Sequence, residues 1–379
     1  MKSKVFKLIV LLVLLSHLTG CRKNEAEINY DRSYINEIKT ARKDVSFYMA
    51  RNFVPGANVA VAKEGKIIYS EGLGLASKDL EVPARRSTKF RIGEVSEVFT
   101  TLLYHIMVEK GILHPDSAVQ SYYPQFPEKQ YSISLRHLVQ QTSGIRPPTH
   151  IEEDWRGLNI SIKKGIENFE NDSLQSPPGM FQISSMFNYN LLGAIMEETT
   201  GRHFHNLLKD YVTDTLALAN TQVDNPLAVI ENRSDYFDHD FIAQVVHATT
   251  RDMRYRVPSS GLLSNAEDLV KFGNALLFSE YISDDIREKL FEPLILPGDI
   301  PALMSNGWIT LEDRSGKKFY GKSGSVTGGS AAILIYPEDE LVVAFASNLS
   351  AISEDMPVFH IAGHFLPDDN EEQQTPQEK

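Results

Sequence analysis

Segments typical of β-strands stand near both ends of this chain, and a mostly helical stretch, from about 94 to 290, separates them. Near the N-terminus, residues 57–62 and 66–70 flank the turn Glu64-Gly65, a pattern that predicts a β-hairpin. Because every strand needs a partner, we expect both ends to meet in one antiparallel sheet, with the helical region inserted between them. The C-terminal strands are expected at 306–311, 317–321, 330–336 and 341–347.

The sequence therefore predicts an α/β (α+β) protein with one domain over residues 31–366. Its sheet part would comprise about 31–93 and 291–366, and its helical part about 94–290. A chain of 379 residues is long enough to bury a large core. A binding site is expected in a cleft between the two parts. Helical spacing of apolar residues predicts helices at 31–51, 99–109, 191–200, 266–277 and 352–365.

The first residues have the pattern of an export signal. Lys2, Lys4 and Lys7 precede the apolar run 8–15, which is too short to span a bilayer. The run leads to Leu18-Thr19-Gly20-Cys21, which resembles the lipobox of bacterial lipoproteins. This resemblance implies a signal peptide over 1–20 and acylation of Cys21.

The mature chain would then be held at a membrane outside the cytoplasm, through a polar tether over 21–30. Arg22 favours the outer membrane in a host that has one, since Asp is the usual inner-membrane retention signal at that position. Cys21 is the only cysteine, so it has no disulfide partner. The alternative is an ordinary cleaved signal peptide with an incidental cysteine.

Charge and composition exclude some function classes. The net charge of −12 argues against a broad nucleic-acid-binding surface. The hydrophobic fraction of 42% and the charged fraction of 23% are ordinary for a soluble globular protein. Residues 367–379 are acidic and rich in Gln, and are expected to form a disordered tail.

Several segments resemble one family in its order and at its spacing. The family is that of the serine β-lactamases and penicillin-binding proteins, with its class C β-lactamase, D-alanyl-D-alanine carboxypeptidase and esterase members. The resemblance covers about residues 50 to 350 and implies the β-lactamase/transpeptidase-like fold. The matching segments are 90–126 (FRIGEVSEVFTTLLYHIMVEKGILHPDSAVQSYYPQF), 134–145 (SLRHLVQQTSGI), 178–202 (PGMFQISSMFNYNLLGAIMEETTGR), 258–272 (PSSGLLSNAEDLVKF) and 320–348.

The family's reactive motif, S-x-x-K, is replaced in this sequence. The serine would attack an acyl carbon and the lysine, one helical turn later, would accept its proton. Here Glu94 and Glu97 stand at these positions. A carboxylate that attacked an acyl group would give a reactive anhydride, so neither residue replaces the hydroxyl. Ser96 lies about 200° from Glu94 around a helix and should face away from the cleft.

The other two motifs differ in how well they are kept. The usual Tyr-x-Asn corresponds to Ser184-Ser185-Met186, which lacks both the phenol and the amide. The third motif, K-[ST]-G, is retained as Lys322-Ser323-Gly324 on an expected strand. Lys322 would contact a substrate, or would form an ion pair with Glu94 or Glu97 and close the cleft. The residues expected to line the cleft are Glu94, Glu97, Ser184, Lys322, Ser323 and Gly324.

No metal or cofactor is expected. His360 and His364 are four residues apart in the last expected helix, but a third ligand is not apparent. The acidic loop 235–240 lacks the glycine spacing of a calcium loop. Glu94 and Glu97 acting as paired acid and base, or ligating a metal with a third group, is a further alternative without other support.

Three functions remain open. The first is a membrane-anchored pseudoenzyme that binds a peptidoglycan fragment, a peptide or an acyl small molecule in the cell envelope. The second is an active serine hydrolase with a displaced nucleophile, such as Ser184. The third is a scaffold with a vestigial cleft that binds a protein partner, which the sequence does not name. Fold alone does not carry the family's activity, and the chain is expected to be inactive.

Overall fold

The computed structural model describes residues 28–153, 161–350 and 356–367. Within them, a nine-stranded sheet has the order β1-β3-β2-β16-β15-β14-β13-β12, and β4 pairs with β3. All of these pairings are antiparallel. The strands are β1 (Ile28–Tyr30), β2 (Gly56–Lys63), β3 (Lys66–Ser77), β4 (Val82–Pro83), β12 (Met304–Ser305), β13 (Trp308–Glu312), β14 (Lys318–Val326), β15 (Gly329–Tyr336) and β16 (Leu341–Ser347).

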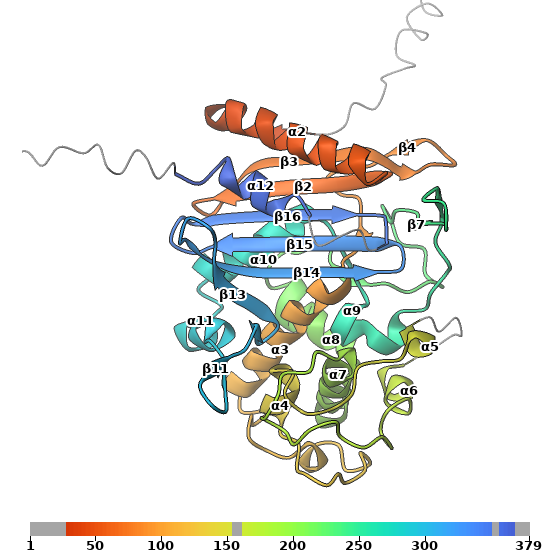
Figure 1. Cartoon of the computed structure of the whole chain (residues 1–379), viewed down its shortest axis with the longest axis vertical. Helices are drawn as coiled ribbons and strands as arrows, with labels where there is room; N and C mark the ends of the chain where they lie inside the picture. The colour runs from red at the N-terminus through yellow and green to blue at the C-terminus, as the bar shows by residue number, and fades with distance from the viewer. Residues whose placement is uncertain (1–27, 154–160, 351–355, 368–379) are drawn as a thin grey trace, which may run out of the picture.

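The two ends of the domain meet where β2 pairs with β16, with Ala57 opposite Ser347 and Lys63 opposite Leu341. This pairing confirms the prediction of one antiparallel sheet built from both ends of the chain. Figure 1 shows the N-terminal strands and the C-terminal strands side by side in the sheet.

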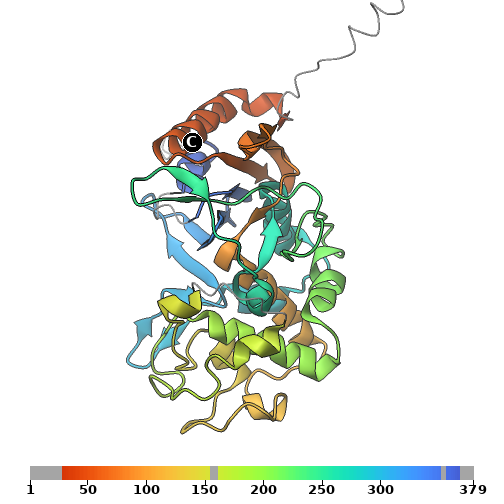
Figure 2. The same ribbon diagram turned by 90° about the vertical axis from the view of Figure 1, so that its right-hand side faces the viewer.

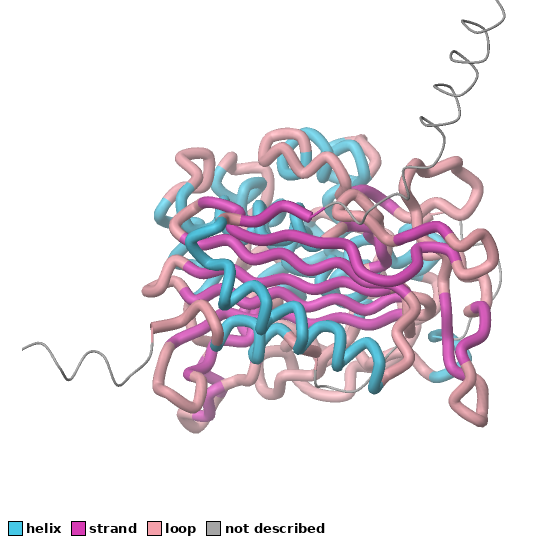
Figure 3. Tube along the Cα trace, turned by 90° about the horizontal axis from the view of Figure 1, so that it is seen from above, coloured by secondary structure: helices cyan, strands magenta, loops and turns pink. Residues whose placement is uncertain are grey.

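Alternate residues of each strand enter two different cores, as the pleat of a strand requires. Val59 and Val61 of β2 pack in the core under α2 (Ile35–Arg51) and α12 (Val358–Gly363). Ala60 and Ala62, on the other face, belong to the core that includes α10 (Ala266–Phe278). Helices therefore cover both faces of the sheet, and Figure 3 shows α2 and α12 lying across one of them.

The inserted helical part lies on the side of the sheet opposite to α2, as Figures 1 and 2 show. Its central helix, α3 (Ser96–Glu109), is buried along nearly its whole length because it is surrounded by other helices and the sheet. The other helices are α4 (Leu135–Val139), α5 (His150–Glu153), α6 (Ile162–Ile166), α7 (Met186–Thr200), α8 (Phe204–Leu208), α9 (Val257–Ser260) and α11 (Asp284–Phe291).

Short strands complete the fold. A small three-stranded sheet has the order β5-β9-β6 and joins the two parts of the domain. Its strands are β5 (Phe90–Arg91), β6 (Gln222–Val223) and β9 (Leu262–Ser264); two further hairpins pair β7 (Phe237–His239) with β8 (Val245–His247) and β10 (Ile295–Leu296) with β11 (Ile300–Pro301).

The strand predicted at 306–311 was wrong at its beginning. Asn306 and Gly307 both have positive φ angles, 49° and 81°, and form a two-residue turn between β12 and β13. Asn-Gly is the dipeptide that such turns prefer, because both central residues must adopt left-handed conformations. The helix predicted at 352–365 is described only as α12, since residues 351–355 lie outside the described part of the chain.

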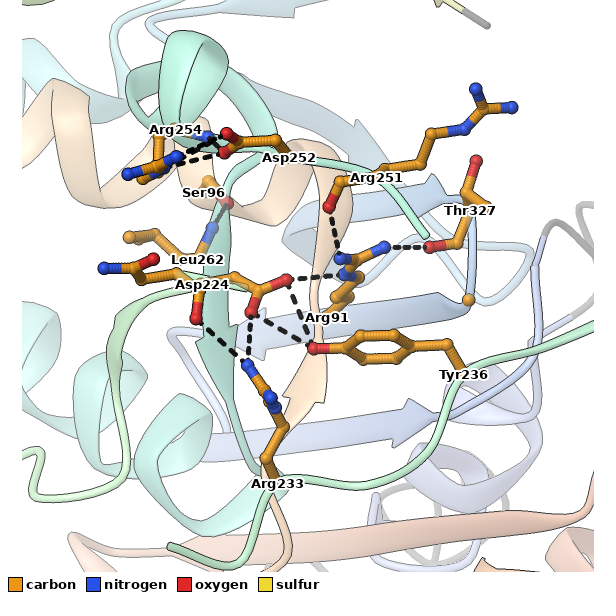
Figure 4. A network of polar contacts seen from close by, with 12 residues as sticks. Arg91, Ser96, Asp224, Arg233, Tyr236, Arg251, Asp252, Arg254, Leu262 and Thr327 are labelled. Carbon is orange, nitrogen blue, oxygen red and sulfur yellow. Dashed lines mark hydrogen bonds and ion pairs between the residues drawn. The ribbon is translucent and has the colours of Figure 1, made fainter. Parts of the chain in front are cut away.

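A polar network around a buried ion pair connects the small sheet to the large one (Figure 4). The guanidinium of Arg91 donates to Asp224 at 2.7 Å, and both side chains are only 1% exposed. Arg91 also donates to the carbonyls of Thr327 and Arg251, and its guanidinium carbon lies 3.8 Å from the centre of the Tyr236 ring. Because Thr327 lies in the β14–β15 turn, this network fixes β5, and the residues that follow it, against the large sheet.

The substitution Asp224→Asn should destabilise the protein by about 3–5 kcal/mol, because it leaves Arg91 charged and buried without its anion. Urea unfolding of the variant and the natural protein measures this difference. The control is Asp116→Asn, which breaks the exposed pair with Arg136 and should cost less than about 1 kcal/mol. Equal losses of stability in the two variants would show that the pair of Arg91 with Asp224 contributes no more than an exposed ion pair does.

Candidate functional site

The beginning of α3 meets β14 at backbone contact. Glu94 lies in a short 3₁₀ turn, Gly93–Val95, directly before α3. A Cβ on Gly93 would lie 2.5 Å from the amide nitrogen of Ser325, and one on Gly324 would lie 2.3 Å from that of Glu94. Only glycine at both positions lets the two segments approach so closely, and Gly93 also has a positive φ of 54°.

Glu97 and Lys322 form a buried ion pair at the centre of this crossing. The ammonium nitrogen of Lys322 donates to Oε2 of Glu97 at 2.6 Å. The side chains are 5% and 4% exposed. Burial raises the pKa of Glu97, whereas the charge and the hydrogen bond of Lys322 act in the opposite direction. Of the two partners predicted for Lys322, the structure therefore selects Glu97.

Glu94 has a different partner, the backbone of β14. Its Oε2 accepts a hydrogen bond of 2.8 Å from the amide of Ser325, the residue after Lys322-Ser323-Gly324. Its Oε1 lies 3.8 Å from Nη2 of Arg256, whose Nε donates to Ser260 at 2.6 Å. The side chain of Glu94 is 36% exposed. The carboxylate of Glu94 thus accepts a hydrogen bond from the backbone of β14, and it forms no hydrogen bond or ion pair with Lys322.

Ser96 lies behind the site, as its place on the helix predicted. It is fully buried, and its hydroxyl accepts a hydrogen bond of 3.2 Å from the amide of Leu262 in β9 (Figure 4). This contact ties α3 to the small sheet, so Ser96 has a structural role.

The segment predicted to replace Tyr-x-Asn is placed at the start of α7. Ser184 is exposed, and Met186 is buried. Ser185 caps α7, because its Oγ accepts from the amide of Phe187 and donates to the carbonyl of Arg146. Among the described residues, no hydrogen bond or ion pair joins Ser184 to Glu94, Glu97 or Lys322. Ser323 is exposed on β14.

Gln141, directly before Thr142-Ser143-Gly144, supports this segment through its side-chain oxygen. Its Oε1 accepts from the amide of Ser185 at 3.0 Å and from the side-chain amide of Asn188 at 2.5 Å. Gln141 is buried and has a positive φ of 61°. The backbone conformation and the partners depend on the fold around it, so local pattern could not have revealed them.

Two cavities among the described residues lie away from this crossing. One, of about 910 Å³, lies among α6, α7 and α8, with Arg254 and Val257 at its wall. Another, of about 440 Å³, is lined by Arg136, His137 and the loop 294–299. Neither is lined by a residue predicted for the cleft.

The other candidate ligands also find separate partners. His364 has its Nε2 2.6 Å from Asp44 of α2, while His360 is exposed. No cluster of three potential metal-ligating His, Cys, Asp or Glu residues occurs in the described part of the chain. Within the same residues, no helix is both long and apolar enough to cross a membrane.

Comparison with known proteins identifies the family. The family model described as beta-lactamase matches residues 41–358. This chain therefore belongs to the beta-lactamase family, and it shares the mixed α/β architecture of the penicillin-binding and esterase members. The predictions of family and fold are thus confirmed.

Two curated relatives illustrate the range of the family. The chain is similar to the serine beta-lactamase-like protein LACTB, mitochondrial, of Mus musculus, with 26% identity over 75% of this chain and 70% of the relative. It is also similar to penicillin-binding protein 4* of Bacillus subtilis, with 24% identity over 81% and 71% of the two chains.

Solved structures show the same fold at lower identity. A penicillin-binding protein homologue from Pyrococcus abyssi superimposes with a TM-score of 0.74 at 22% identity, over 86% of this chain and 75% of that one. A class C beta-lactamase mutant gives a TM-score of 0.73 at 18% identity, over 89% and 99%.

The pair formed by Glu97 and Lys322 can be tested by a double-mutant cycle. Glu97→Leu or Lys322→Met alone should cost about 3–5 kcal/mol of stability, because each leaves a buried charge without its partner. The double variant should cost less than the sum, since both charges are then gone. Urea unfolding of the four proteins measures the coupling, and simple additivity of the two losses would contradict the ion pair.

Proposed function

We propose that this chain is a membrane-anchored lipoprotein of the cell envelope that has lost acyl-serine chemistry and acts as a binding or sensing module. The observation that carries the proposal is the pair formed by Glu97 with Lys322, at 2.6 Å and almost fully buried. In our interpretation of the family motif, Glu97 stands where a lysine would accept the proton of a serine, and Glu94 stands where that serine would be.

Nucleophilic chemistry needs a hydroxyl with a base beside it and donors for the developing oxyanion. At this crossing, the ammonium of Lys322 is committed to Glu97, and the amide of Ser325 donates to the carboxylate of Glu94. The hydroxyl of Ser96 is turned toward β9. These contacts support a protein that recognises a ligand without forming an acyl intermediate.

The ligand class that we propose follows from the family and the location. A peptidoglycan fragment, a peptide or an acyl small molecule would meet the exposed surface around Glu94 and Ser323. Two alternative functions are each supported by a specific observation. Ser184 is exposed at the start of α7, which would suit a displaced nucleophile. The buried ion pair of Glu97 with Lys322 would suit a scaffold protein whose site is vestigial.

Covalent labelling tests the loss of chemistry. The natural chain, incubated with labelled penicillin and separately with a fluorophosphonate, should show no adduct in its intact mass. The variant Glu94→Ser/Glu97→Lys, which restores the hydroxyl and the cation, should be labelled if the surrounding site is otherwise intact. Removing a nucleophile from such a site usually costs several orders of magnitude in rate, so the contrast should be large.

Control variants give each other labelling result a defined meaning. A stoichiometric adduct on the natural chain would reject the pseudoenzyme, and its loss in Ser184→Ala would name the displaced nucleophile. The variant Ser96→Ala should behave as the natural chain does, because that hydroxyl is buried behind the site. A double variant that folds but stays unlabelled would favour the scaffold with a vestigial site.

The anchor requires a separate experiment. Expressed with its leader in a bacterial host, the chain should be cleaved before Cys21 and gain the mass of its acyl groups, which intact-mass measurement of the membrane fraction detects. The variant Cys21→Ala should gain no acyl mass, because alanine has no thiol that could be acylated. Cleavage elsewhere, with an unmodified cysteine, would reject the lipoprotein.

A further inference from the structure

The outer side of α2 carries an exposed row of basic and aromatic residues. Lys39, Lys43, Phe47 and Arg51 follow one another at intervals of four, so they lie along one side of the helix. All four are exposed, and Phe47 is 69% exposed although it is a large aromatic residue. Figure 1 shows α2 as the outermost element on its side of the sheet, so this row is not covered by another described element.

Carboxylates are scarce along this row. The only acidic residue of α2 between Lys39 and Arg51 is Asp44, which is partly buried and lies 2.6 Å from His364. The row is therefore locally cationic, although the whole chain has a net charge of −12. A local excess of positive charge on an acidic protein indicates a specific partner surface more than a general solubility feature.

The first strand extends this surface. Ile28 stands opposite Glu71, and Tyr30 stands opposite Tyr69. Residues that stand opposite each other in antiparallel strands point to the same face of the sheet. Since Glu71 accepts from Arg42 of α2 at 2.9 Å, Ile28 and Tyr30 point to the side that α2 occupies. They are 40% and 43% exposed.

We propose that this surface docks the protein flat on an anionic membrane. The α2 face, as we call it, consists of Ile28, Tyr30, Lys39, Lys43, Phe47 and Arg51. Aromatic and apolar side chains enter the boundary between headgroups and acyl chains, while Lys and Arg contact the anionic headgroups. The α2 face presents both kinds of side chain on one surface.

The position of the proposed anchor agrees with this orientation and rests on the proposed function. Cys21 precedes Ile28 by seven residues. Even fully extended, seven residues reach no more than about 25 Å. An acylated Cys21 would therefore keep the membrane close to the place where the chain enters the fold, which is beside α2. Ile28, where the tether would join the fold, is itself part of the α2 face.

Vesicle binding of the unacylated chain, from Arg22 to Lys379, tests the proposal apart from the anchor. The removed residues precede Ile28 and so lie outside the described fold. The chain should sediment with vesicles of phosphatidylcholine containing roughly one third phosphatidylglycerol, and not with phosphatidylcholine alone. Binding should weaken as salt is raised from about 0.05 M to about 0.5 M, because the Debye length shortens.

Substitutions should locate the binding on the α2 face. Each Lys or Arg near an anionic surface is worth roughly fivefold in partitioning, so Lys39→Gln/Lys43→Gln/Arg51→Gln should reduce binding at least about tenfold. Phe47→Ser should also reduce it without changing the charge. The matched control, Lys110→Gln/Lys164→Gln/Lys209→Gln, removes three exposed cations of the helical part and should bind as the natural chain does.

Failure of the docking surface can be distinguished from failure of the lipid anchor. Failure of the natural chain to bind anionic vesicles at low salt, or equal losses in the two triple variants, would overturn the docking surface, whatever the state of Cys21. Vesicle binding by the natural chain that only the α2 variants lose would support it, even if Cys21 proves to be unmodified. Thermal unfolding of all variants shows whether any loss of binding comes from loss of the fold.

Discussion

The pairing of β2 with β16 is the constraint on which the other parts of this structure depend. It joins segments from the two ends of the domain, with Gly56–Lys63 beside Leu341–Ser347. Once these strands are adjacent, β14 and β15 extend the sheet away from the N-terminal hairpin. The inserted helical part then has to leave the sheet through β5 and return to it, and α3 begins directly against β14. The position of the site thus follows from the order in which the strands of the sheet pair.

The charges at the site balance one another. Two carboxylates and two cations meet there: Glu97, Lys322 and Arg256 are buried, whereas Glu94 is partly exposed. A buried ion pair contributes little net stability compared with apolar packing, yet losing one partner is costly. Such a pair therefore resists change at either position alone. The chain keeps the fold of its family with this ion pair buried where α3 meets β14.

The two proposed surfaces lie on different sides of the sheet. The α2 face is on one side, and the helical part with the crossing of α3 and β14 extends on the other (Figures 1 and 2). A domain docked through α2 would direct the surface around Glu94 away from the bilayer, toward soluble envelope components. A short tether and a flat docking surface would also restrict rotation of the domain, which favours one orientation at the membrane.

Much of the fold was determined by the sequence itself. Alternation along 57–62 and 341–347, and the helical spacing in 31–51 and 266–277, are local properties that specify strands and helices wherever the chain folds. The residues at 94, 97 and 322 could likewise be identified from sequence. The tertiary structure determined which groups the side chains of these residues contact. Lys322 contacts Glu97 and not Glu94, because the approach of Gly93 to Gly324 directs the side chain of Glu94 to the amide of Ser325. Partner choice depends on distances of a few ångströms between segments far apart in the chain, and local periodicity does not encode such distances. For the same reason, the pairing of Arg91 with Asp224 became visible only in the folded chain.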